Sequence, residues 1–212
     1  MSKNTKWTLT TFLLLIIVGI GAVQLICSQS SLFRTPSSNV EKLTKDEALK
    51  KLTPLLEKAD TLYSKLDAYS VKEIKPWLDE IALIIQSIKG DPTISKSFLA
   101  KVYFAKGLFA GSIADQAQFS QGLDKGPVSY YAFRECILLD PSHTKAIIAL
   151  SDSFVGVMKQ GWIKRKIALG SFKFNPSVEK KFILEKIAAL SANQVTTDIK
   201  TAEDKVSKIN VD

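Results

Sequence analysis

Two helical patterns that meet at Asp140-Pro141 constrain the fold of this chain more than any other feature. Ser129, Phe133 and Cys136 lie at the spacing of one helical face just before this dipeptide. Pro141 lacks an amide N–H and biases Asp140 away from helical angles, so the first helix should end there. A second apolar face follows at Ala146, Ile147, Leu150 and Phe154. We therefore expect an antiparallel pair of helices joined by a tight turn.

Helical periodicity covers nearly all of the chain after residue 39. Further helices are expected over residues 40–69, 70–89, 94–117 and 178–192. Thr44 and Glu47 have the spacing of a capping box, and Gly90 should follow the end of the second helix. Pro54 either kinks the first helix or begins another one. The tail, residues 193–212, has a further apolar stripe at Val195, Ile199, Ala202, Val206 and Ile209. This short amphipathic helix either caps the domain or docks on a partner.

The pattern around Pro141 resembles the tetratricopeptide repeat (TPR). That family has small, aromatic and small residues on helix B, a proline in the turn, and large, leucine, small and aromatic residues on the next helix A. The residues in register are Ser129, Phe133, Cys136, Pro141, Ala146, Ile147, Leu150, Ser151 and Phe154. Pro141 and Pro176 are 176 − 141 = 35 residues apart, close to the TPR period of about 34. The resemblance implies an all-α, TPR-like array of helical hairpins, an α-solenoid, over residues 40–192.

The segment after Pro92 also resembles a TPR helix A, through Leu99, Ala100, Tyr103, Phe104 and Gly107. The chain then departs from the family pattern, because an insertion at residues 108–128 precedes the next helix B. We expect this insertion to lengthen the helix and to form a loop at residues 122–127. The segment before Pro176 is interpreted as a degenerate repeat.

The resemblance also implies where a partner binds. Stacked TPR hairpins form a superhelix whose concave groove is lined by the A helices, and a partner helix or peptide can lie in it. The family's groove positions correspond to Ser97, Lys101, Phe104, Ala105, Lys145, Ile148, Asp152 and Val155. For each of them the alternative is ordinary surface.

An apolar segment without charge occupies residues 7–27, after a short flank at residues 1–6. As a helix it spans about 30 Å, the thickness of a bilayer core, and we interpret it as a transmembrane signal anchor. A cleaved signal peptide and a lipoprotein signal with Cys27 as the lipidated residue are the alternatives. The residues before Ser28 do not fit a cleavage site, and Ile26 is bulky for a lipobox.

Positive charge next to the anchor sets its expected orientation. Lys3 and Lys6 precede the apolar segment, whereas the Ser-rich linker at residues 28–39 carries only Arg34. This bias favours a cytoplasmic N-terminus. In a bacterium it places the folded domain in the periplasm, tethered to the inner membrane.

The net charge of +8 favours contact with acidic surfaces. Cations and aromatic residues alternate in a patch that contains Lys159, Trp162, Lys164, Arg165, Lys166, Phe172, Lys173, Phe174, Lys180 and Lys181. This patch is interpreted as a solvated basic helix face, or as a contact for anionic lipid headgroups or an acidic partner. We do not expect nucleic acid, since an outward-facing domain would not meet it.

No residue pattern indicates catalysis. The chain lacks nucleotide-binding loops, nucleophile elbows and C-x-x-C pairs. His143, the one histidine, lies in a predicted surface turn, Cys136 stands where TPRs bury a small residue, and Cys27 ends the apolar segment. We therefore expect no enzyme, no cofactor and no metal. The expected function is a membrane-anchored scaffold or adaptor for protein–protein interaction in the bacterial cell envelope. The alternatives are a structural accessory subunit of a larger membrane complex or a lipoprotein-like helical binding protein.

Overall fold

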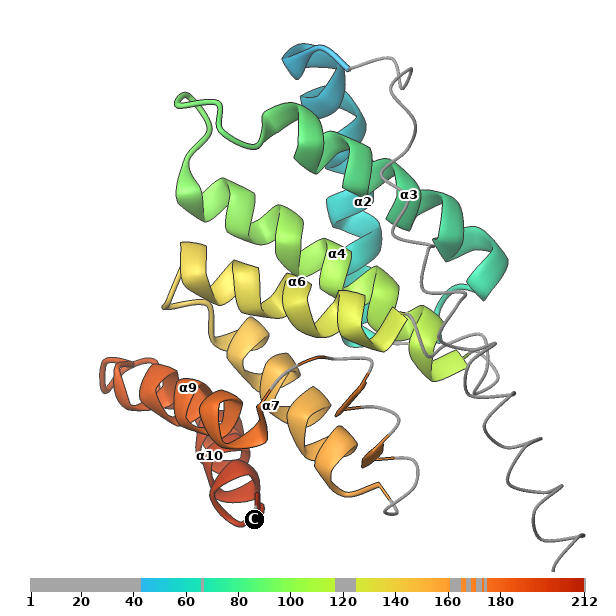
Figure 1. Cartoon of the computed structure of the whole chain (residues 1–212). Helices are drawn as coiled ribbons and strands as arrows, with labels where there is room; N and C mark the ends of the chain where they lie inside the picture. The colour runs from blue at the N-terminus through green and yellow to red at the C-terminus, as the bar shows by residue number, and fades with distance from the viewer. Residues whose placement is uncertain are drawn as a thin grey trace, which may run out of the picture. The chain divides into compact units, whose positions relative to one another are not determined.

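The computed structural model describes residues 43–65, 67–116, 125–160, 165–166, 169–170, 173 and 175–211. Within these ranges the chain forms seven α-helices and no strand, so the all-α class predicted from periodicity is confirmed. The helices are α2 (Lys45–Ser64), α3 (Val71–Ile88), α4 (Lys96–Gln116), α6 (Lys125–Leu139), α7 (Thr144–Met158), α9 (Pro176–Ala188) and α10 (Thr197–Ser207) (Figure 1). They belong to one unit that spans Lys42–Asp212.

Local capping signals set the ends of the first helices. The backbone N–H of Thr44 donates to Glu47 Oε2 at 2.9 Å, and the backbone N–H of Glu47 donates to Thr44 Oγ1 at 3.4 Å, which confirms the capping box. Gly90 has φ of +91° directly after the C-cap of α3, as expected for a terminating glycine. Pro54 lies inside α2, so the alternative that it begins a second helix is wrong.

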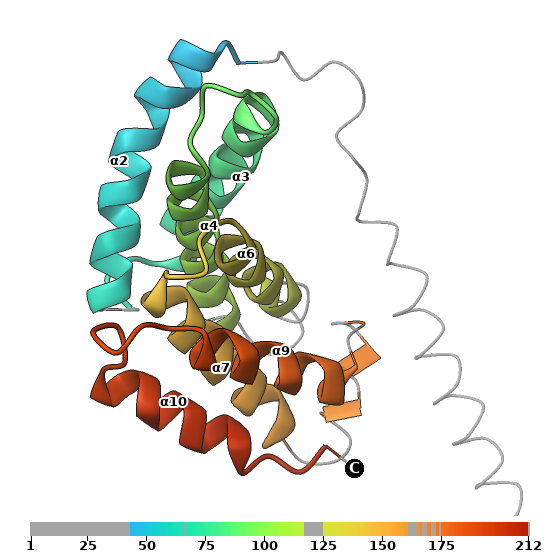
Figure 2. The ribbon, with the colours of Figure 1, turned by 90° about the vertical axis from the view of Figure 1, so that its left-hand side faces the viewer.

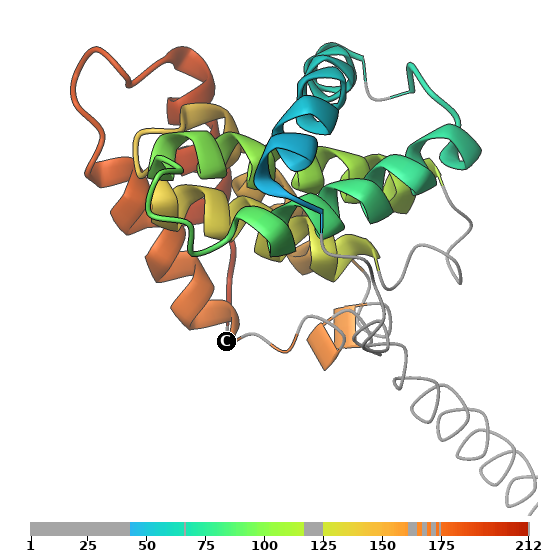
Figure 3. The same cartoon turned by 90° about the horizontal axis from the view of Figure 1, so that it is seen from above.

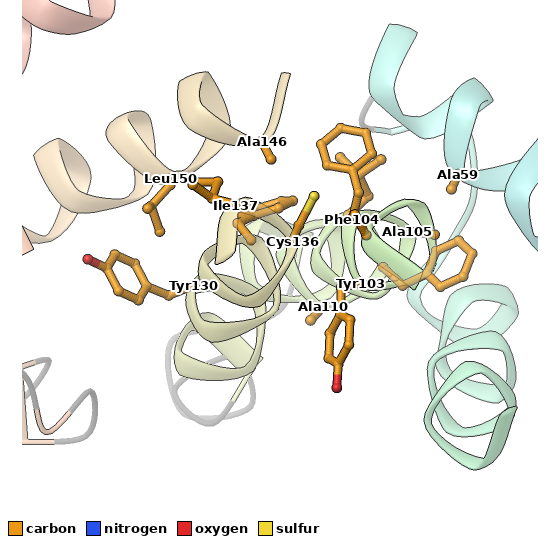
Figure 4. Packing of buried hydrophobic residues seen from close by; sticks show 14 of the residues in the cluster. Ala59, Tyr103, Phe104, Ala105, Ala110, Tyr130, Cys136, Ile137, Ala146 and Leu150 are labelled. Carbon is orange, nitrogen blue, oxygen red and sulfur yellow. The ribbon is translucent and has the colours of Figure 1, made fainter. Parts of the chain in front are cut away.

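The hairpin around Pro141 has the predicted form. Helix α6 ends at Leu139, and the side chain of Asp140 accepts a hydrogen bond from the backbone N–H of Ser142 at 3.0 Å in the turn. The residues expected on the two inner faces are all buried: Ser129, Phe133, Cys136, Ala146, Ile147, Leu150 and Phe154. Figure 4 shows Ile137 of α6 on the side of that helix that faces Ala146 and Leu150 of α7.

The insertion differs in part from its prediction. Helix α4 continues to Gln116, so the first part of residues 108–128 lengthens this helix as expected. The prediction of a loop at residues 122–127 is wrong for the last three residues, because α6 begins at Lys125 and includes Gly126 and Pro127. Proline is compatible with the first turn of a helix, because a backbone N–H at that position would have no acceptor within the helix. Residues 117–124 lie outside the described residues.

Helices that follow one another in the chain pack against one another in antiparallel pairs. Helix α2 runs against α3, with Lys45 near Asp91 at 3.4 Å and Lys51 near Glu80 at 3.6 Å. Helix α4 runs against α6, where Ser129 Oγ donates to the carbonyl of Gly107 at 2.8 Å. Helix α9 runs against α10, because its Lys180 reaches the last turn of α10.

Helices α2, α4, α7 and α10 follow one another along one side of the domain, and α3, α6 and α9 lie beside them (Figure 2). Contacts join α2 to α4 and α7 to α10, so these pairs skip the intervening helix. Near the start of α7, Ser142 accepts from Gln194, and further along Asp152 pairs with Lys205 at 2.8 Å. Helices α7 and α10 are therefore parallel. Figure 3 shows α9 and α10, in red, at one end of the central green and yellow helices.

The C-terminal helix is part of this domain. Ile199, Ala202 and Val206 of α10 are buried, and α10 contacts α7 and α9. The apolar stripe of the tail is therefore covered by the chain's own helices, as a cap requires. Helix α9 begins at Pro176 and ends at Ala188, slightly earlier at both ends than predicted.

None of the described helices is both long enough and apolar enough to cross a bilayer. The predicted anchor at residues 7–27, with its flank at residues 1–6 and the linker at 28–39, lies outside the described residues.

Candidate functional site

Aromatic and cationic side chains from three helices meet in what we call the Tyr63 cluster, which consists of Tyr63, Phe104, His143 and Lys145. The ring centroids of Tyr63 (α2) and Phe104 (α4) are 5.7 Å apart, and those of Phe104 and His143 are 4.7 Å apart. The ammonium nitrogen of Lys145 (α7) lies 4.5 Å from the Tyr63 ring centroid. The cluster thus joins the end of α2, the middle of α4 and the start of α7.

Helix ends and burial position these side chains. Tyr63 occupies the last turn of α2, next to the fully buried Leu62, and remains 37% exposed. Phe104 lies beneath it and is only 6% exposed. Lys145 is in the first turn of α7 and is exposed. A cation over an exposed aromatic ring contributes about 0.5–1 kcal/mol, so this contact is weak enough for a partner to replace.

Some of the charged side chains around the Tyr63 cluster form ion pairs and others do not. Among the described residues no carboxylate forms an ion pair with Lys101 or Lys145, whereas Asp152 is paired with Lys205. Burial, together with the carboxylates of Asp198 and Asp152, raises the pKa of the Tyr63 hydroxyl. Helices α7 and α10 therefore present acidic groups toward the same region. The side next to Phe104 and His143 is cationic.

His143 has a structural role that the sequence did not indicate. It is the N-cap of α7, and its Nδ1 accepts a hydrogen bond from the backbone N–H of Ala146 at 3.2 Å. The side chain is half-buried against Phe104 rather than free in a surface turn. Burial lowers the pKa of His143, opposed by the nearby Asp140 and assisted by Lys145 and Lys101. Its N-capping acceptor requires the neutral form.

Folding stability is expected to fall on acidification below about pH 6.5 because of His143. Its pKa is lower in the folded than in the unfolded state, so the unfolded chain takes up the proton first. The stabilisation is fully present above the unfolded pKa and is lost as pH falls toward the folded one. His143→Asn keeps a capping acceptor and removes the titration. Urea unfolding followed by circular dichroism should show a smaller decrease between pH 7 and 5.5 for this variant. Equal decreases in both proteins would contradict the assignment.

The eight residues predicted to line the concave groove separate into two groups by their exposure. Ser97, Lys101, Lys145 and Asp152 are exposed, and Ile148 is half-buried. The other three are buried, so the prediction that they line a groove open to a partner needs correction: Phe104, Ala105 and Val155. Phe104 and Ala105 belong to α4, which contacts α2, α3 and α6 and has few exposed positions. Phe104 is the buried member of the Tyr63 cluster.

The basic–aromatic patch is only partly described. Lys159, Lys166 and Lys173 are exposed and Arg165 is half-buried. Trp162, Lys164, Phe172 and Phe174 lie outside the described residues. Lys180 is part of the fold, because its ammonium donates to the carbonyls of Ser207 at 2.9 Å and Ile209 at 2.8 Å.

Cys136 is a core residue. Its side chain is fully buried, and burial together with Asp140 raises the pKa of the thiol to about 12. A thiol held protonated is a poor nucleophile, which agrees with the predicted packing role. In the described part of the chain, no three His, Cys, Asp or Glu side chains are grouped so that they could hold a metal ion.

Sequence reasoning missed several residues at these surfaces. Nothing in the sequence pointed to the contact of Tyr63 with Lys145. The pairing of Asp152 with Lys205 was also missed, since the two residues lie in different predicted segments. No family model, no curated protein and no solved structure matches this chain.

Proposed function

We propose that the helical domain is a TPR-like scaffold that binds a partner protein along the side formed by α2, α4, α7 and α10. Residues 7–27 would tether it to the inner membrane of a bacterium, with the domain in the periplasm. It would act as an adaptor in the cell envelope and carry out no chemistry of its own.

The order and direction of the helices support the TPR-like part of this proposal. The antiparallel pairs α2–α3 and α4–α6 are followed by α7, α9 and α10, and each of these described helices contacts the next described one. The additional contacts α2–α4 and α7–α10 join helices two steps apart. Such nearest-neighbour stacking of hairpins is the general organisation of helical repeat arrays.

The Tyr63 cluster is the observation that carries the binding proposal. It presents an exposed aromatic ring beside Lys145, and Lys101 lies near the adjacent His143. Neither lysine forms an ion pair with a described carboxylate. Tyrosine is among the residues that most often carry the binding energy of protein interfaces. A segment that carries acidic side chains fits this part of the surface best, because charge complementarity selects partners and accelerates association.

Site-specific photo-cross-linking in native membranes tests the proposal. A photoreactive amino acid at Ser97, which is exposed at the start of α4, should give a defined cross-linked protein. The same group at Lys72, exposed on α3, should not. The variant Lys101→Glu/Lys145→Glu should reduce the product at least about tenfold, equivalent to about 1.4 kcal/mol. The control Lys72→Glu/Lys75→Glu makes the same change in net charge and should leave it unchanged.

Equal cross-linking from α3 and α4, or an unchanged yield in the Lys101→Glu/Lys145→Glu variant, would contradict binding at this surface. Native sizing after detergent extraction addresses the alternative of a fixed subunit. A stoichiometric high-mass assembly in which all of the protein is found would favour that alternative over an adaptor.

A further inference from the structure

We propose that the outer face of α9, with the adjoining part of α6, docks on the surface of an anionic lipid bilayer. This α9 face consists of Val178, Lys181, Phe182 and Lys186, with Tyr131 from α6 and Lys173 just before the helix. The proposal concerns a surface separate from the Tyr63 cluster and does not depend on the binding of a partner protein there.

The pattern of burial along α9 defines this face. Glu179, Ile183 and Ile187 are buried and recur every four residues, so they mark the side of the helix that faces the core. Val178 is 57% exposed, the highest value among the large hydrophobic residues of the described chain. Lys181 and Glu185 are also exposed and lie on the same outward side.

Internal pairing leaves an excess of positive charge on the α9 face. Glu179 accepts hydrogen bonds from the Tyr130 hydroxyl at 2.9 Å and from Arg134 Nε at 3.3 Å, so its charge is directed inward. Lys173, Lys181 and Lys186 remain, opposed by Glu185. The Lys181–Glu185 pair is 3.8 Å apart and largely exposed, and such a pair is held weakly. Lys181 is therefore available to a lipid phosphate at little cost.

Aromatic side chains lie beside these cations. The Phe182 ring has the Arg134 guanidinium carbon 4.5 Å and the Lys186 ammonium 5.4 Å from its centroid. Tyr131 is 39% exposed, and the pKa of its hydroxyl is raised by burial and by the adjacent Glu179. Aromatic rings and long cationic side chains suit the headgroup region, where the stems contact apolar surface and the charged ends reach phosphates.

A bilayer fits this surface better than a protein does. The α9 face is little more than three helical turns of one helix with one neighbouring tyrosine, whereas a stable protein interface buries about 800 Å² on each partner. Shallow insertion of an aliphatic side chain surrounded by lysines needs no such area, and each cation near an anionic leaflet strengthens association about fivefold. The predicted anchor would keep the domain close to the bilayer, which raises the effective concentration of lipid.

Quenching in nanodiscs measures this docking on the full chain. An environment-sensitive fluorophore is attached to Ser177→Cys, which is exposed next to Val178, in a Cys27→Ala background. Cys136 is buried and will not react in the folded protein. Nanodiscs of phosphatidylglycerol with a trace of doxyl-labelled lipid should quench this fluorophore, and nanodiscs of phosphatidylcholine should not. A fluorophore at Thr53→Cys, exposed on α2, should be quenched in neither.

Charge reversal supplies the matched comparison. The variant Lys173→Glu/Lys181→Glu/Lys186→Glu should lower the docked-to-undocked ratio in anionic nanodiscs at least about tenfold. The control Lys50→Glu/Lys72→Glu/Lys75→Glu changes the net charge equally on α2 and α3 and should dock like the parent. Absence of quenching at Ser177→Cys in anionic discs, equal quenching in neutral discs, or equal docking of the two variants would overturn the proposal. An acidic protein as the true occupant would also leave the fluorophore unquenched in these protein-free discs.

Discussion

Gly107→Ala is expected to destabilise the helical domain by about 2 kcal/mol, although alanine is the better helix former. An added Cβ would lie 2.4 Å from Cε1 and 2.5 Å from Cδ1 of Phe133, far inside van der Waals contact. Phe133 is buried, and its ring centroid is 5.7 Å from that of Phe104, so a shift of the Phe133 ring would disturb this contact. Overpacking of this kind costs about 1–3 kcal/mol or more, against a gain of about 1 kcal/mol in helix propensity.

Gly156→Ala is the matched control for this prediction. Gly156 is also inside a helix, but a Cβ there would have no atom within 4 Å. Only the propensity gain remains, so this variant should be stabilised by about 0.5–1 kcal/mol. Urea unfolding followed at 222 nm measures both, and Gly107→Ala/Phe133→Leu should recover part of the loss. If Gly107→Ala were as stable as Gly156→Ala, the close contact between α4 and α6 would not exist.

Glu179→Ala is expected to cost about 3 kcal/mol of folding free energy. Glu179 is 6% exposed, and its carboxylate accepts hydrogen bonds from Tyr130 and Arg134, which join α9 to α6. Removing one partner of a buried pair costs about 3–5 kcal/mol, because the other charge stays buried without it. Arg134 is 28% exposed, so the lower end of this range applies. Chemical unfolding at neutral pH gives the value directly.

Two variants separate charge loss from other effects at this site. Glu179→Gln retains an acceptor for the Tyr130 hydroxyl and should cost less than Glu179→Ala. Glu185→Ala removes a carboxylate from the same helix, but from an exposed pair with Lys181, and should change stability by less than about 0.5 kcal/mol. Equal effects of Glu179→Ala and Glu185→Ala would show that the contact between α6 and α9 contributes nothing specific.

The sequence predicted the elements of this fold well where the signals were local. The capping residues Thr44 and Glu47 predicted the start of α2, and Gly90 predicted the end of α3. The position of Pro54 in its helix could not be predicted, because proline occurs both at the start of a helix and, less often, in its interior. The loop expected at residues 122–127 failed at its end for a similar reason, since Gly126-Pro127 is typical of loops and also permitted in a first helical turn.

The candidate sites were less predictable. Repeat register selected Lys101 and Lys145 for the groove, and both are exposed, but it also selected Phe104, which α2 covers with Tyr63. Register specifies which side of a helix a residue occupies. It does not specify how closely the next helix approaches that side, and the approach decides exposure.

By itself the sequence determined that the described chain is helical, that a turn separates α6 from α7 at Pro141, and which residues of these two helices form their buried faces. These properties depend on interactions within about four residues, which periodicity, caps and prolines record directly. Only the tertiary structure decided that Lys145 contacts the Tyr63 ring, that Glu179 is buried in a hydrogen bond with Tyr130, and that the side chain of Val178 is exposed. Such contacts join helices distant in sequence, and their geometry follows from the packing of whole helices, which no local pattern encodes.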